Sequence, residues 1–129
     1  YWLSMLPREY RLKKNKDFEI LFQEGRFVSG DLCIVKVWEV EPERYPRRGL
    51  TKDDLRIGFS VGVKVSKKAV VRNRLKRQMR EVVRRLLKEE RVKKGYYLVV
   101  IAKKGMLGKE HKDIQHDISR VFAKAQILV

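Results

Sequence analysis

The sequence has one cysteine, few acidic residues for its many basic ones, and no long apolar run. Because Cys33 is the single cysteine among 129 residues, an internal disulfide and a multi-cysteine zinc site are both excluded. Without about 18 consecutive apolar residues, we expect no membrane-spanning helix and no membrane partner. The first residues also lack the apolar centre and cleavage site of a secretory signal. We therefore expect a cytoplasmic protein.

Recognisable catalytic and metal-binding motifs are also missing. The sequence has no glycine-rich phosphate-binding pattern, no HExxH and no nucleophile-elbow setting. His111 and His116 would lie about 140° apart around a helix, which suits them poorly to sharing a metal ion. We therefore predict no catalytic residue, no metal site and no cofactor bound by the protein itself. Any chemistry would have to come from a partner.

Basic residues outnumber acidic ones two to one. The chain has 32 Lys and Arg against 16 Asp and Glu, a formal net charge of +16. Hydrophobic residues make up 43% of it, which is enough to build a core. We predict one domain over residues 1–129, with residues 1–9 as a flexible or non-native lead-in. Such an excess of positive charge favours a nucleic acid as partner.

Much of this charge is concentrated in residues 64–85. Ten of these 22 residues are Lys or Arg, and one, Glu81, is acidic. At helical spacing one side is apolar, which predicts an amphipathic helix docked on a core. The other side carries like charges three and four residues apart, which repel each other unless a polyanion lies beside them. The inward positions are Val71, Leu75, Met79, Val82 and Leu86.

The remaining segments predict an α+β fold. A short helix should follow Asn15, as its N-cap, and end before Gly25. Strands are expected over residues 32–40, 56–65 and 96–102, separated by a loop over 41–54 and by the basic helix. A final helix should bury Ile114, Ile118, Val121, Phe122 and Ala125. We predict an α/β sandwich in which helices cover one sheet.

Aromatic side chains suggest a second contact surface. Phe18 and Phe22 share one face of the first helix, and Lys36 shares a strand face with Trp38. A lysine in the middle of that face predicts that it is partly wet. Phe18, Phe22 and Trp38 are therefore candidates for stacking on single-stranded bases, although packing in the core is the ordinary role of such residues.

The segment RNRLKR at residues 72–77, preceded by KKAVV, resembles the bacterial ribonuclease P protein subunit. The resemblance extends to RLKKNKDFEILFQEG, LRIGFSV and YYLVVIAKKG, in that order along the chain. It implies a mainly antiparallel two-layer sandwich, similar to a ribosomal-protein domain, with a left-handed crossover to the basic helix. It further implies an endoribonuclease that removes the 5′ leader of precursor tRNA, in which the RNA subunit and its magnesium perform the catalysis.

The resemblance also assigns roles to individual residues. Phe18 and Phe22 would line the cleft for the leader, and Lys36 stands where the family often has an aromatic, with Trp38 on the same face. The basic helix would grip the RNA subunit. A ribosomal protein or another binder of structured RNA is the alternative. Together with the charge pattern, the resemblance gives as RNA-binding candidates Lys64, Lys67, Lys68, Arg72, Asn73, Arg74, Lys76, Arg77, Arg80 and Arg84.

Overall fold

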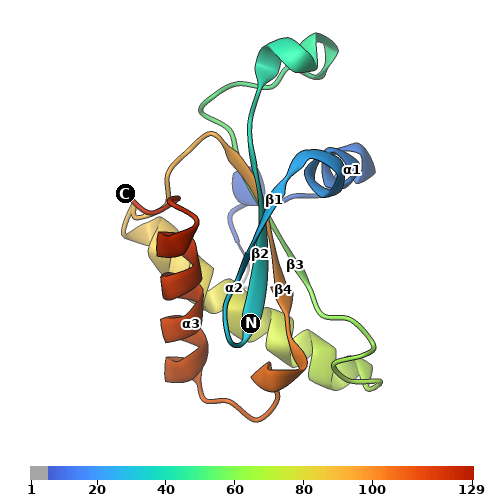
Figure 1. The fold of residues 1–129 in the computed structure, drawn as a ribbon, viewed down its shortest axis with the longest axis vertical. Coiled ribbons are helices and arrows are strands. Elements are labelled where there is room, and N and C mark those ends of the chain that lie inside the picture. Colours follow the sequence, from blue (N-terminus) through green and yellow to red (C-terminus); the bar gives the residue numbers. More distant parts are fainter. Residues whose placement is uncertain (1–5) are drawn as a thin grey trace.

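The computed structural model describes residues 6–129, which form three helices and a four-stranded sheet (Figure 1). Short 3₁₀ turns join some of these elements. Leu6, within the lead-in of residues 1–9, is buried against the core, and residues 1–5 lie outside the described part. The elements are α1 (Asn15–Glu24), β1 (Arg26–Ser29), β2 (Cys33–Glu39), β3 (Leu55–Ser60), α2 (Ala69–Lys88), β4 (Tyr96–Ala102) and α3 (His111–Lys124).

The strands lie in the order β1-β2-β4-β3. β2 is antiparallel to both β1 and β4, whereas β3 and β4 are parallel and are joined through α2. The predicted α+β class with a mainly antiparallel sheet is therefore confirmed. β1 is absent from the prediction because its four residues, RFVS, are too few to give a strand pattern.

Helices α2 and α3 pack together on one side of the sheet, and α1 lies on the other (Figure 1). The predicted inward faces of both long helices are buried, except that Val71 is only partly covered. The basic helix therefore exposes its charged side to solvent, as its pattern predicts. Apolar burial of this kind stabilises the fold by about 1.5–3 kcal/mol per large side chain.

Helix α1 crosses the middle of the opposite face. The Phe18 ring lies against Gly58 of β3, where an added Cβ would come within 3.2 Å of two ring carbons. Ile20 and Leu21 are buried beneath the helix, and Phe22 follows towards β1. Asn15 is the first helical residue and not the predicted N-cap, a position that Lys14 takes without a side-chain cap.

On the strand face predicted to be partly wet, Lys36 and Trp38 themselves are buried, and only Ile34 towards the other end is partly exposed. Lys36 is 6% exposed and Trp38 is 3% exposed. The loop over residues 41–54 folds over this end of the sheet, so Tyr45 meets the Trp38 ring edge-on from one side and Tyr97 meets it from another. A loop that returns over its own strand leaves no periodic signal in the sequence.

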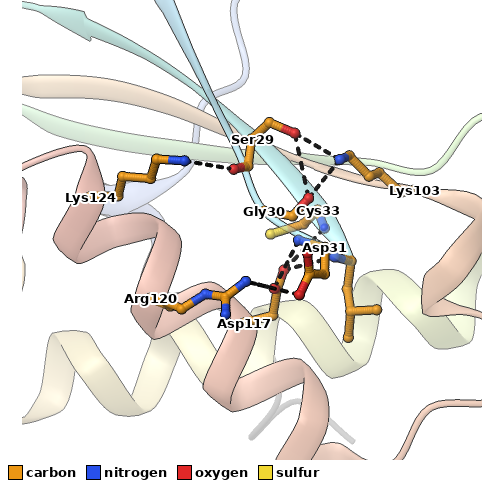
Figure 2. A network of polar contacts seen from close by, with 9 residues as sticks. Ser29, Gly30, Asp31, Cys33, Lys103, Asp117, Arg120 and Lys124 are labelled. Atoms are coloured by element: carbon orange, nitrogen blue, oxygen red, sulfur yellow. Dashed lines mark hydrogen bonds and ion pairs between the residues drawn. The ribbon is translucent and has the colours of Figure 1, made fainter.

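A carboxylate from α3 fixes the turn between β1 and β2 (Figure 2). The buried Asp117 side chain accepts hydrogen bonds from the backbone N–H groups of Asp31, Leu32 and Cys33, at 3.0–3.1 Å. Arg120 lies 2.9 Å from the Asp31 carboxylate and 3.7 Å from that of Asp117. One side chain thus satisfies three donors that a turn of this shape leaves without strand partners.

Candidate nucleic-acid interface

The outward side of α2 is basic along its whole length. Asn73, Arg74 and Arg77 are exposed, and Arg72, Lys76, Arg80 and Arg84 are half-buried around them. Among residues 6–129, no carboxylate forms an ion pair with Arg74, Lys76 or Arg80. The structure therefore brings these predicted RNA-binding residues onto one surface and leaves most of their charge uncompensated.

The turn before α2 adds positive charge at the start of the helix. Lys64, Lys67 and Lys68 are all exposed. Ser66 stabilises this turn through two hydrogen bonds. Its Oγ accepts one from the Lys68 N–H at 3.2 Å, and its carbonyl accepts one from Nη1 of Arg72 at 3.0 Å. The helix start has no acidic residue and no side-chain cap. Cations at the positive end of a helix dipole are unfavourable unless an anion compensates them.

On the face that bears α1, one strip of the sheet is left open. Residues paired across strands lie side by side on one face, and the row Gly58, Val99, Lys36 and Phe27 runs beneath and beside α1. The next row lies beyond the helix, and its members are only partly buried or exposed. We call this row the open strip, and it consists of Ser29, Ile34, Ile101 and Ser60.

Phe22, Phe27 and Lys36 form a cluster at the β1 end of α1, which we call the aromatic–lysine cluster. The Lys36 Nζ lies 5.1 Å from the Phe22 ring centroid and 4.2 Å from that of Phe27, and it donates a 2.6 Å hydrogen bond to the Phe22 carbonyl. The two rings are 46% and 63% exposed. Two solvated phenyl rings anchored over a buried cation can accept stacked bases on their outer faces.

Phe27 was missed by the sequence analysis, and the available signal was weak. Its position in the register, directly opposite Lys36, becomes visible only once β1 is recognised as a strand. Phe18 and Phe22 both lie on α1, with Phe18 half-buried, and Lys36 of β2 lies beside Phe22. Trp38 is separate from them, inside the second core with Tyr45 and Tyr97, and offers no open ring face.

Two further observations concern the titratable groups of the described residues. Within residues 6–129, no group of three or more His, Cys, Asp or Glu side chains is placed to hold a metal ion. Burial, together with the nearby Asp117 carboxylate, raises the pKa of the Cys33 thiol far above its ordinary value, which disfavours the nucleophilic thiolate form. In the described part, no helix has the length and hydropathy needed to cross a membrane.

Comparison with known proteins identifies the family. The family model for ribonuclease P matches residues 6–126. The chain belongs to the ribonuclease P protein family. The ribonuclease P protein component of Symbiobacterium thermophilum is 34% identical over 123 residues, covering 95% of this chain and 96% of that protein. The component from Clostridium kluyveri is 36% identical over 116 residues, covering 90% and 94% of the two chains.

Solved structures of the ribonuclease P protein agree with this assignment. The Staphylococcus aureus protein superimposes with a TM-score of 0.73 at 26% identity, over 93% of this chain and 98% of that one. The Thermotoga maritima protein gives a TM-score of 0.70 at 26% identity, over 88% and 96%. The resemblance seen in the sequence is therefore confirmed. The family assignment supports a ribonuclease P protein subunit over the alternative of a ribosomal protein.

Proposed function

We propose that this protein binds the catalytic RNA of ribonuclease P through α2 and the turn before it, and so promotes removal of the 5′ leader from precursor tRNA. The observation that carries the proposal is the uncompensated positive charge on the outward side of α2, where Arg74, Lys76 and Arg80 have no carboxylate partner among the described residues and where Lys76 and Arg80 lie four residues apart. Like charges at this spacing destabilise an isolated helix by a few tenths of a kcal/mol per pair. RNA phosphates would remove that cost and release counterions on binding.

In this proposal the protein supplies binding and orientation, and the RNA supplies the chemistry. The described residues offer no cluster of acidic or imidazole ligands that would hold magnesium. We therefore assign the magnesium of the holoenzyme to the RNA. A cytoplasmic location is also part of the proposal, since the buried, unpaired Cys33 suits a reducing compartment.

The 5′ leader would lie along the open strip beside α1. Ile34 and Ile101 provide a half-buried apolar floor, and Ser60 leads through a short turn towards the lysines that precede α2. Single-stranded RNA is bound by stacking of its bases on aromatic rings and by cations along its backbone. Phe22 and Phe27 would supply the rings at the β1 end.

Reconstitution with ribonuclease P RNA and precursor tRNA tests the proposal. The holoenzyme should cleave the precursor at salt concentrations where the RNA alone is slow. The affinity of the protein for the RNA should fall steeply with salt, with a slope of roughly 0.7 to 0.9 in log affinity per neutralised phosphate. Affinity that stayed constant when salt was raised several-fold would contradict a phosphate-dominated interface.

A further inference from the structure

A second basic site lies on the other side of α1 from the open strip. It is a pocket of about 350 Å³ between the start of α1, the β3 edge and the loop over residues 41–54. The pocket adjoins the row Arg56 and Tyr97, whereas the open strip contains Ser60 and Ile101, and α1 lies between the two rows. Six cations line it: Arg8, Arg11, Lys13, Lys14, Arg48 and Arg56.

The positive charge of this pocket is mostly uncompensated. Its two carboxylates are Asp17 and Asp54, so the six cations leave a formal charge of +4. Arg48 bonds the Asp17 carboxylate at 2.7 Å, and Asp54 accepts bonds from the backbone and hydroxyl of Thr51. In the described part of the chain, the other five cations form no ion pair.

Two of the cations are held in place by backbone carbonyls. Nε of Arg11 donates to the Leu6 carbonyl at 2.7 Å, and Nη1 of Arg56 donates to the Glu9 carbonyl at 2.6 Å. Each guanidinium keeps further N–H donors for a ligand, because a carbonyl takes only one of its five. These arginines are therefore oriented before any ligand arrives, which lowers the entropy cost of binding.

The pocket is continuous with the basic side of α2. A neighbouring hollow of about 260 Å³ is lined again by Arg11 and Lys13, and also by Lys76 and Arg80 of α2. A basic belt therefore runs along the β3 edge from α2 to the pocket. An acidic protein segment could match the charge, but continuity with α2 favours RNA, whose phosphates are evenly spaced along such a path.

We propose that this pocket binds a backbone phosphate of RNA, which makes it a second anchoring point beyond α2. The inference rests on the proposed RNA-binding function of α2. Its volume accommodates one nucleotide-sized group, and its donors are the planar guanidinium forks and ammonium groups that suit phosphate oxygens. The phosphate belongs either to the catalytic RNA or to the precursor tRNA, and the experiment below distinguishes these two sources.

The test variant is Lys13→Ala with Lys14→Ala, two exposed lysines of the pocket. The matched control is Lys93→Ala with Lys94→Ala, an equally exposed adjacent pair between α2 and β4, with the same change in net charge. Affinity is measured for three probes over a range of salt concentrations. Ribonuclease P RNA is titrated with the free protein. Precursor tRNA and mature tRNA are titrated with the assembled holoenzyme.

The pocket variant should weaken binding of at least one probe by about fivefold more than the control. Its salt slope should also fall by about 0.7 to 0.9 for each lost phosphate contact. A loss for ribonuclease P RNA assigns the phosphate to the catalytic RNA. A loss for tRNA probes alone assigns it to the substrate. Equal behaviour of pocket and control variants with every probe overturns the proposal.

Two further measurements keep the outcome clear. Arg8→Ala removes another exposed pocket cation and replaces the double variant if the latter melts at a lower temperature than the control. Arg74→Ala on α2 reports on the proposed function itself. If Arg74→Ala weakens RNA binding while the pocket variants match their control, the pocket proposal alone fails. If Arg74→Ala is also without effect, the function proposed for α2 fails.

Discussion

The ammonium nitrogen of Lys36 lies 4.2 Å from the centroid of the Phe27 ring, which is contributed by the neighbouring strand. Lys36 is only 6% exposed, so its charge has lost most of its contact with water. The Phe22 carbonyl and the two aromatic rings replace that water. Phe27 therefore has two roles: it helps to stabilise the buried Lys36 charge, and it forms part of the surface that RNA would meet.

Phe27→Ala should weaken binding of precursor tRNA that carries a 5′ leader. Loss of one stacked base corresponds to about 1–3 kcal/mol, or roughly five- to 150-fold in affinity. Because the ring is 63% exposed, the melting temperature should change little. Affinity for mature tRNA is the control, and Phe27→Tyr should retain leader binding because it keeps the ring. Equal losses for precursor and mature tRNA would remove Phe27 from the leader site.

The two sides of α2 should respond differently to truncation. Met79 is fully buried, so Met79→Ala should lower the free energy of unfolding by about 2–5 kcal/mol. Arg74 is exposed, so Arg74→Ala should leave the melting temperature nearly unchanged and weaken binding of ribonuclease P RNA. Thermal melting and RNA affinity are measured on both variants. The reverse pattern would mean that the helix presents its other side to the RNA.

Asp117→Ala should destabilise the fold more than Arg120→Ala does. The change removes the acceptor of three backbone N–H groups in a partly buried turn, which should cost about 2–5 kcal/mol. Arg120→Ala is the matched control, since its side chain is 53% exposed and its ion pairs should contribute about 1 kcal/mol or less. Chemical denaturation measures both. A loss for Asp117→Ala no larger than for Arg120→Ala would contradict this role.

Tyr97 should make stability depend on alkaline pH. Burial, followed by the charges of Asp17 and Asp54, raises the pKa of Tyr97 from 10.0 to about 12. The neutral phenol is thus favoured in the folded state, and its contribution is fully present below pH 10 and lost as the pH rises to about 12. Over that window, the unfolding free energy should fall more steeply for the protein than for Tyr97→Phe, by up to about 1.4 kcal/mol per pH unit. Parallel slopes would contradict the raised pKa.

The elements that are regular and amphipathic were predictable from the sequence. The inward stripe of α2, Leu75, Met79, Val82 and Leu86, is buried, and so are the residues expected of the final helix, of which Ala125 lies just beyond the end of α3. The helical period of about 3.6 residues is enough to identify these buried faces, because it determines which side of the helix each side chain lies on. The same reasoning identified the exposed charges of α2 before the fold was known.

Features that depend on tertiary contacts were not predictable. The strand pattern predicted that Lys36 is exposed to solvent, but α1 and Phe27 cover its side chain. The loop over residues 41–54 covers Trp38 and contributes Arg48 to the basic pocket, although its sequence indicated only a break between strands. Neither result follows from local periodicity, because both depend on which distant segments meet across the sheet.

The dependence of the β1–β2 turn on Asp117 has a consequence for the order of events during synthesis. Asp31, Leu32 and Cys33 leave the ribosome long before α3, which follows every other element of the chain. Until α3 emerges, the three N–H groups of the turn must be hydrated, and the adjacent end of the hairpin stays loosely held. Among the described elements, we therefore expect the β1 end of this hairpin, which carries Phe27, to become fixed only after α3 has been made.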